Sequence, residues 1–272
     1  MTPSPRLKER VAWISGGASG MGEAIAELFA EEGAKVAIID VQAERGREVE
    51  RRITGAGGRA LFIPTDVADD AQVRDSIEQT ARTFSALHII VNCAGIVDVA
   101  PLHEYEPEQW DRLMAVNVKS IYLSMRHGIA HLKRSKRSFV VNIGSIGSYT
   151  GQGMTPAYNT SKHAVLGLSR CIALDYAADG LRCNCICPGI TDTPLFRYHM
   201  STAPDPEAAI AERLKRVPMG VALTPRDIAK AALYLSCDDS SGITGAMLVV
   251  DAGYTVPVEW QHPGRTAFME TP

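Results

Sequence analysis

The chain has 272 residues, a formal net charge of −3 and 46% hydrophobic residues. This length and apolar content support a sizeable core in one large domain or two small ones. The balanced charge argues against nucleic-acid binding, and no apolar run reaches transmembrane length. The first ten residues are polar and lack the apolar centre of a signal peptide. We therefore expect a cytoplasmic protein without membrane or nucleic-acid partners.

Three of the six cysteines alternate along one short run, at Cys183, Cys185 and Cys187. Alternate residues of a strand share one face, so these three cannot surround a tetrahedral ion by themselves, and no histidine lies near them. We expect small buried side chains here, reduced thiols throughout and no metal site. The other cysteines are dispersed: Cys93, Cys171 and Cys237.

The N-terminal part of the chain predicts a nucleotide-binding unit. An apolar run at 11–14 is followed by a glycine-rich loop at 15–22, a helical pattern and a second apolar run that ends on Asp40. Glycines permit a tight turn and a close approach of the backbone to a phosphate, and a helix N-terminus offers free N–H groups to it. An acid about 20 residues further on can accept both ribose hydroxyls. The glycine spacing is Gly-x-x-x-Gly-x-Gly rather than Gly-x-Gly-x-x-Gly.

The same acid predicts which cofactor binds. A carboxylate at Asp40 would repel a 2′-phosphate, and Ala18, Ser19 and Val41 supply no cation to offset that repulsion. Arg45 is the one nearby candidate, and we expect it on a solvated helix face. The sequence therefore favours NAD over NADP.

Apolar runs and helical patterns keep alternating to the C-terminus, which predicts an α/β fold. We expect a single domain over 1–272: a doubly wound parallel sheet of about seven strands with helices on both faces. Ligands of such sheets bind beyond the carboxyl ends of the strands. The further elements expected are helices at 42–54, 69–84, 107–131, 155–176 and 227–235, and strands at 59–64, 88–91, 138–143, 181–187 and 246–251.

A tyrosine and a lysine four residues apart, Tyr158 and Lys162, indicate acid–base chemistry. On a helix they share one face, about 6 Å apart along the axis. A free phenol is a poor base near pH 7. A cation about 4 Å away favours phenolate by roughly 1 kcal/mol in a watery site and about 4 kcal/mol at an effective dielectric of 20, so a partly dry cleft is needed. Taken alone, such a pair also occurs by chance on many helices.

Two further polar residues stand out in the sequence. Ser145 follows the strand at 138–143, so it reaches the same edge of the sheet as the glycine loop. Asn117 lies in the middle of the helix at 107–131, between Val116 and Val118. Those valines indicate burial, while an exposed polar position is the plain alternative.

The chain contains a series of short motifs in a fixed order: Gly16, Gly20 and Gly22; Asp40; Asp66 and Val67; Asn92, Cys93, Ala94 and Gly95; Asn117; Ser145; Tyr158 and Lys162; and Pro188 and Gly189. Together they resemble the short-chain dehydrogenase/reductase family, in its single-domain NAD-dependent branch, from about Leu7 to Gly253. Ser15 and Cys93 depart mildly from the family, which usually has Thr at the first position and Asn or Ala at the second.

The resemblance implies an oxidoreductase that interconverts a secondary alcohol and a ketone by hydride transfer. Tyr158 would be the general acid/base, Lys162 would favour its phenolate and bind the nicotinamide ribose, Ser145 would hydrogen-bond the substrate oxygen, and Asn117 would hold a water linking Lys162 to solvent. A homotetramer is also implied. The implied cofactor-binding residues are Gly16, Ser19, Gly20, Met21, Gly22, Asp40, Asp66, Val67, Asn92, Ala94, Gly95, Tyr158, Lys162, Pro188, Gly189, Ile190, Thr191 and Thr193.

Substrate choice is expected in the segment 190–221, which lacks strong periodicity from Leu195 onward and is predicted to form a lid. The segments 97–103 and 147–154 would supply other walls. A sugar or polyol, a hydroxy acid and a small cyclic alcohol stay open, with a lean to polyhydroxylated substrates by family analogy. His199 is either a substrate contact or an ordinary exposed histidine. The extension at 254–272 either crosses to a neighbouring subunit or folds back.

Two other functions compete with the dehydrogenase. A non-catalytic NAD-sensing protein would not need the set of Asn117, Ser145, Tyr158 and Lys162. An epimerase or dehydratase with retained NAD would resemble relatives that carry a larger C-terminal substrate domain, and few residues follow the last predicted strand.

Overall fold

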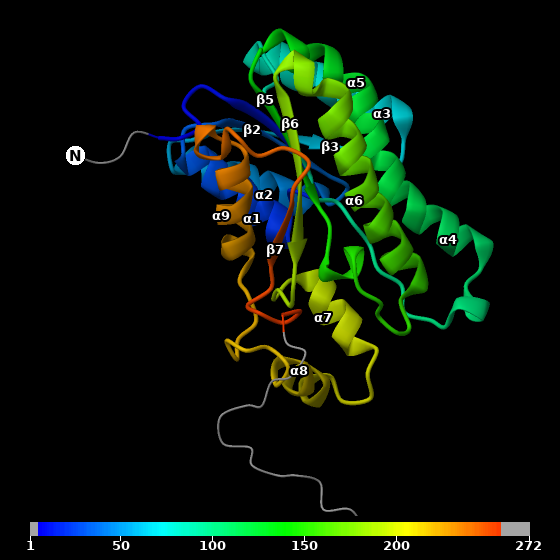
Figure 1. The fold of residues 1–272 in the computed structure, drawn as a ribbon. Coiled ribbons are helices and arrows are strands. Elements are labelled where there is room, and N and C mark those ends of the chain that lie inside the picture. The colour runs from blue at the N-terminus through cyan, green and yellow to red at the C-terminus, as the bar shows by residue number, and fades with distance from the viewer. Residues whose placement is uncertain (1–4, 257–272) are drawn as a thin grey trace, which may run out of the picture.

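The computed structural model describes residues 5–256, and its centre is one parallel sheet of seven strands (Figure 1). The strand order is β3-β2-β1-β4-β5-β6-β7. The predicted doubly wound parallel sheet is therefore confirmed. Its strands are β1 (Val11–Ser15), β2 (Lys35–Asp40), β3 (Arg59–Pro64), β4 (Ile89–Asn92), β5 (Ser138–Ile143), β6 (Leu181–Pro188) and β7 (Met247–Val250).

Helices cover both faces of the sheet because successive strand residues point to opposite sides. In β1, Ile14 packs into the cluster that holds α1 and α9, while Trp13 packs into the cluster that holds α3, α5 and α6. Both side chains are fully buried, as expected for apolar strands covered twice. The helices are α1 (Gly20–Glu31), α2 (Ala43–Gly55), α3 (Asp70–Phe84), α4 (Pro107–Met114), α5 (Ser120–Arg134), α6 (Pro156–Tyr176), α7 (Pro194–Ser201), α8 (Pro206–Leu214) and α9 (Pro225–Leu235).

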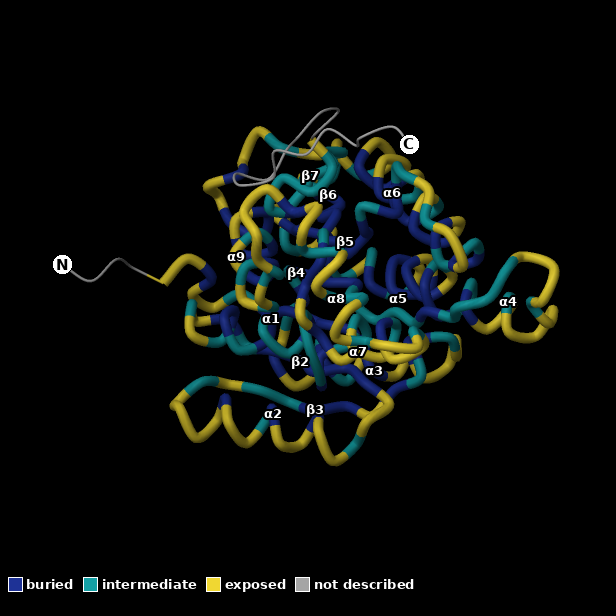
Figure 2. The backbone as a smooth tube through the Cα atoms, turned by 90° about the horizontal axis from the view of Figure 1, so that it is seen from below, coloured by how far each residue is buried: buried dark blue, intermediate teal, exposed yellow. Residues whose placement is uncertain are grey.

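The strand order reverses between β1 and β4, which lie side by side. From β1 the chain proceeds outward to β2 and β3, and then returns to place β4 on the other side of β1. The loops after β1 and β4 therefore diverge and leave a crevice at the carboxyl edge of the sheet. Figure 2 shows that edge from below, with α7 and α8 lying across the strand ends.

The helix predicted at 107–131 is interrupted. The structure has α4, a π-helical turn at Ala115–Lys119, and then α5, which continues to Arg134. Asn117 lies in that π turn and is only 2% exposed, so its burial is confirmed and its regular helical setting is not. The spacing of apolar residues in the sequence does not reveal one π-helical turn, because the apolar face of the helix continues through that turn.

The expected lid segment is helical rather than irregular. Thr193 and Asp205 accept hydrogen bonds from the backbone N–H groups of Phe196 and Ala208, and a proline follows each cap. These caps start α7 and α8, which have only eight and nine residues. Helices this short show too few apolar repeats for periodicity to reveal them, whereas their caps and prolines were present in the sequence.

The three alternating cysteines are packed in the core. Cys183, Cys185 and Cys187 are each fully buried on the side of β6 that faces α6, which confirms their expected role as small core residues. Burial raises the pKa of the Cys183 thiol, so this group stays protonated. Residues 5–256 contain no cluster of three or more side chains suited to a metal ion.

Within residues 5–256, no helix is both long enough and apolar enough to cross a membrane. Of the predicted extension at 254–272, only its first three residues fall in the described part of the chain. There Thr255 donates to Asp251, and its hydroxyl lies 2.8 Å from the Tyr149 hydroxyl oxygen. The remaining residues, 257–272, lie outside the described residues.

Replacing Phe29 with Ala should lower the free energy of unfolding by about 3–5 kcal/mol, because this fully buried ring of α1 packs in the cluster shared with α9. Chemical denaturation would measure the change. Leu102→Ala is the matched control: Leu102 is 64% exposed, so its loss should cost below about 0.5 kcal/mol. A Phe29→Ala loss no larger than that of the control would contradict the packing described.

Candidate active site

The glycine loop between β1 and α1 requires residues without side chains. Gly16 has a φ of +68°, and a Cβ there would lie 2.9 Å from the Ala94 Cα. A Cβ on Gly22 would collide with the carbonyl oxygen of Gly16. The loop backbone is therefore packed against both the first turn of α1 and the loop after β4. Ser19 is the N-cap of α1 and its side chain makes no capping bond, so the first N–H groups of the helix are available to an anion.

The hydroxyl of Ser15 joins the loops after β1 and β4. Its Oγ accepts the backbone N–H groups of Cys93 at 3.1 Å and Ala94 at 3.2 Å. A serine hydroxyl thus supplies the bonds at a position where a threonine was the family expectation. Cys93 lines the neighbouring cavity, and burial raises the pKa of its thiol to about 12, so it is uncharged at neutral pH.

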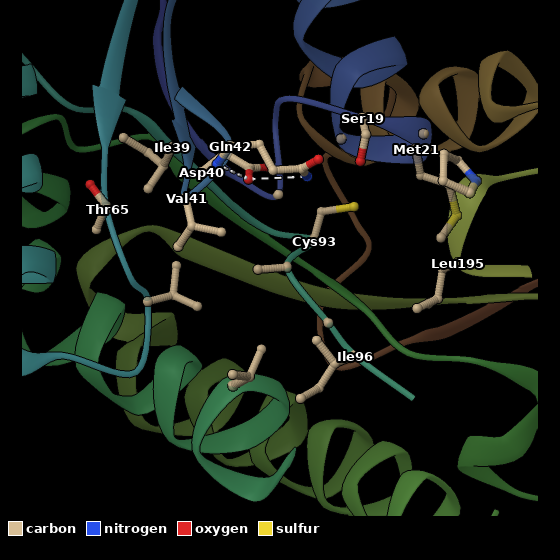
Figure 3. A pocket seen from close by; sticks show the side chains of 18 of the residues that line it. Ser19, Met21, Ile39, Asp40, Val41, Gln42, Thr65, Cys93, Ile96 and Leu195 are labelled. Atoms are coloured by element: carbon tan, nitrogen blue, oxygen red, sulfur yellow. Dashed lines mark hydrogen bonds between the residues drawn. The ribbon is translucent and has the colours of Figure 1, made fainter. Parts of the chain in front are cut away.

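Asp40 is held rigidly at the end of β2 (Figure 3). Its carboxylate accepts the backbone N–H of Ala18 at 3.1 Å and that of Gln42 at 3.0 Å, and the residue is 7% exposed. Figure 3 places Ser19, Met21 and Leu195 toward the opposite end of the same cavity. Arg45 is exposed on α2 and does not line this cavity, as predicted.

This first cavity, about 830 Å³ counted to its open mouth, lies over the crevice between β1 and β4. It brings together most of the residues that the resemblance implied for cofactor binding. From that set, the lining contains Gly16, Ser19, Gly20, Met21, Gly22, Asp40, Asp66, Val67, Ala94, Gly95 and Thr193.

Arg112 also lines the first cavity, and no sequence pattern indicated it. Its guanidinium lies 2.9 Å from the Asp66 carboxylate. Burial alone would raise the pKa of Asp66, but the Ala68 N–H and Arg112 outweigh it and hold that pKa below its usual value. Helix α4 reaches the cavity only through its tertiary position, so no local pattern could place Arg112 there.

Tyr158 and Lys162 lie on the first turns of α6, where the sequence predicted a helix. Thr155 and Pro156 start it, and the Lys162 Nζ lies 5.5 Å from the centre of the Tyr158 ring. Lys162 is 5% exposed, and its Nζ donates to the carbonyl oxygen of Ile143 at 2.9 Å. This bond fixes the ammonium at the end of β5, beside the phenol. The predicted pair therefore shares one face, in a site that is partly dry.

Ser145 and Tyr158 line a second cavity, of about 670 Å³ counted to its open mouth. Met21, Thr193 and Leu195 line both cavities, which therefore adjoin. The Ser145 Oγ accepts the N–H of Gly147 at 3.0 Å, which leaves its own proton available to a ligand. The other residues lining the second cavity are Val97, Gly144, Ile146, Gln152, Pro188, Gly189, Ile190, Thr191, Phe196, His199 and Arg213.

The comparisons with known proteins agree with this geometry. The family model described as Enoyl-(Acyl carrier protein) reductase matches residues 16–255, which include both cavities. The chain belongs to the short-chain dehydrogenase/reductase family.

Members with described functions are similar over nearly the whole chain. The cis-4-hydroxycyclohexanecarboxylate dehydrogenase of Sinomonas cyclohexanicum is 38% identical, covering 91% of this chain and 97% of its own. The 2,5-dichloro-2,5-cyclohexadiene-1,4-diol dehydrogenase of Sphingobium indicum is 39% identical, covering 93% and 99%. A Beutenbergia cavernae structure assigned as an NAD(P)-dependent gluconate 5-dehydrogenase, with NADP bound at low occupancy, matches with a TM-score of 0.87 and 30% identity, covering 94% and 100%.

In this short-chain dehydrogenase/reductase, the buried Asn117 lies close to Lys162. Its amide accepts the N–H of Ile96 at 2.9 Å and donates to the Ile96 carbonyl oxygen and the Ser161 Oγ, each at 3.0 Å. The side chain thus joins the loop after β4 to α6. A Cβ on Gly95 would lie 3.5 Å from the Asn117 Oδ1 and 3.6 Å from the Lys162 Nζ. The predicted water at Asn117 stays a prediction.

Asn92, another predicted cofactor residue, uses its side chain for contacts within the core. Its amide donates to Asn142 at 2.7 Å and accepts from Ser124 at 2.9 Å, and Asn142 in turn donates to Ser169 at 2.8 Å. Asn92 lines neither cavity. The structure gives its side chain a buried bridging position between β4, β5 and two helices.

Replacing Gly22 with Ala should weaken NADH binding at least about tenfold, because the new Cβ requires the Gly16 carbonyl to move. NADH fluorescence titration would measure the affinity. Gly55→Ala is the control, since a Cβ there meets nothing within 4 Å. Unchanged NADH affinity in the Gly22 variant would show that the loop is not a cofactor site.

Proposed function

We propose that this protein catalyses NAD-dependent interconversion of a secondary alcohol and a ketone. The observation that carries the proposal is that Ser145 and Tyr158 line the second cavity together, while the buried ammonium of Lys162 lies 5.5 Å from the centre of the Tyr158 ring. The relatives named above as dehydrogenases support the reaction class. Tyr158 is the proposed general acid/base.

The proton steps follow from the hydrogen-bonding capacity of each group. Ser145 donates a hydrogen bond to the substrate oxygen, while Tyr158, as phenolate, takes the proton of the substrate hydroxyl group. In the reverse direction Tyr158 returns that proton to the carbonyl oxygen. The Lys162 ammonium, fixed by Ile143, stabilises the negative phenolate through space. A nicotinamide cofactor held by the residues lining the first cavity would supply the hydride exchange with the carbinol carbon.

The proposed cofactor is NAD, and Asp40 is the reason. Its carboxylate is fixed by two backbone N–H groups in the lining of the first cavity, where a 2′-phosphate would meet negative charge. Arg112, the one guanidinium in that lining, is already paired with Asp66. Since a similar structure has NADP bound at low occupancy, assays with both cofactors test this preference.

The proposed substrate is a small cyclic alcohol. The two sequence relatives named above act, by their names, on six-membered carbocyclic alcohols. Apolar residues in the second cavity, such as Val97, Ile146 and Phe196, suit a hydrocarbon ring. The names of these relatives and the apolar lining therefore favour a cyclic alcohol over the sugar or polyol substrates that the sequence had favoured. The homotetramer and the cytoplasmic location stay predictions.

Replacing Tyr158 with Phe should reduce kcat by at least about 1,000-fold while leaving the NADH dissociation constant unchanged, because only the proton-transfer group is lost. NADH formation at 340 nm with cyclic alcohols, polyols and hydroxy acids would measure it. Tyr122→Phe is the control, since Tyr122 is 49% exposed on α5. Turnover within tenfold of the parent would sink the assignment. NAD binding without turnover in the parent would instead favour a sensor, and tightly retained NAD an epimerase.

Replacing Asp40 with Asn should lower the ratio of kcat/KM for NAD⁺ over NADP⁺ by about 10- to 100-fold, because it removes a charge and keeps the shape. Parallel assays with both cofactors would give the ratio. Asp75→Asn, at an exposed ion pair with Arg74, should leave it unchanged. A parent enzyme that prefers NADP⁺ would overturn the NAD proposal outright.

A further inference from the structure

The second cavity contains polar groups for which the proton steps above have no use. Arg213 of α8 and His199 of α7 line it together with Ser145 and Tyr158. Both helices lie across the carboxyl edge of the sheet (Figures 1 and 2). The residues that line this cavity include no aspartate or glutamate. Among residues 5–256, the lining of this cavity therefore carries one positive charge, that of Arg213, and no negative charge.

Arg213 has no counter-ion among residues 5–256. Glu212, its neighbour in the chain, pairs with Lys215 at 2.7 Å, and no hydrogen bond or ion pair joins the Arg213 guanidinium to another described side chain. The residue is only partly exposed. A partly desolvated guanidinium without a partner is poorly stabilised, and a planar oxyanion satisfies it best.

His199 adds a neutral hydrogen-bonding group to the same wall. Burial, and then the charge of Arg213, lower the pKa of His199, so its imidazole is uncharged at neutral pH. A neutral imidazole has one N–H donor. The wall thus combines one permanent cation with one neutral hydrogen-bond donor. This combination suits a ligand with one anionic group better than a ligand with two anionic groups.

The rest of the cavity lining is largely apolar and contains no other charged side chain. Val97, Ile146 and Phe196 contribute hydrocarbon surface, and Gln152 is a neutral polar residue. A ligand that fills the cavity therefore has an apolar body, a hydroxyl or carbonyl group at Tyr158, and a group of opposite charge at Arg213.

Building on the proposed function, we infer that the substrate is a secondary alcohol that carries an oxyanion, such as a carboxylate, away from its carbinol carbon. Arg213 binds this oxyanion and His199 donates a hydrogen bond to it. Arg213 lines the second cavity and not the first, where Arg112 lies, so its partner is a substrate group and not a cofactor phosphate.

Kinetics with substrate pairs that are matched in shape and differ in charge test this inference. The pairs are 4-hydroxycyclohexanecarboxylate and 3-hydroxybutyrate, each against its primary amide, so that shape is retained while charge is removed. The parent enzyme should prefer the better carboxylate over its amide by about 30-fold in kcat/KM, as expected for one charge-assisted hydrogen-bond pair. Arg213→Gln should abolish that preference mainly by raising the KM for the carboxylate, and Arg213→Lys should partly restore it.

Arg216→Gln is the matched control. The Arg216 guanidinium lies 5.7 Å from the centre of the Tyr254 ring and does not line the second cavity, so the carboxylate preference should persist. Equal kcat/KM for acid and amide in the parent, or an equal loss for both in Arg213→Gln, would overturn the inference.

Calorimetric binding of the same pairs to the NAD-bound protein keeps this inference separate from the proposed reaction. The parent should bind the carboxylate at least about tenfold more tightly than the amide, and Arg213→Gln should bind both equally. Arg213-dependent binding without any turnover would refute the reaction and support the oxyanion site. Tyr158-dependent turnover without a charge preference would refute the oxyanion site alone.

Discussion

The hydrogen bond from the Lys162 Nζ to the Ile143 carbonyl oxygen is the contact on which the site depends. It satisfies a buried ammonium at the end of β5 and fixes the start of α6 against the sheet. Tyr158 is one turn earlier on that helix, and Ser145 is two residues after Ile143. One contact between a strand end and a helix therefore sets the positions of all three groups. Asn117 reinforces it from the other side through Ser161.

Sequence reasoning was most successful where local chemistry and tertiary position agree. Apolar strands, glycines that need a close approach and an acid at the end of a strand have to occur in this order for a doubly wound sheet to bind a nucleotide. For that reason, the places of Gly16, Gly22 and Asp40 in the fold could be predicted from the order of residues along the chain. The start of α6 could also be placed, because Thr155 and Pro156 precede a clear helical pattern.

Sequence reasoning failed where an element is short, or where the position of an element depends on the whole fold. The π turn around Asn117 and the two helices of the lid segment leave no strong periodic signal. Arg112 and Arg213 look like ordinary helix-surface residues in the sequence, since nothing local shows which cavity a helix will face. Asn92 was expected at the cofactor, whereas its amide bridges Asn142 and Ser124 in the core.

Thr193 has a consequence for the order in which ligands bind. It caps α7 through the N–H of Phe196, it lines both cavities, and a Cβ on Gly20 would lie 3.4 Å from it. A ligand that orders this threonine in the first cavity also orders the start of the helix that walls the second. The two binding free energies are then linked, and the linkage is reciprocal. If the ligand in the first cavity raises the affinity for the ligand in the second, the second ligand raises the affinity for the first by the same factor.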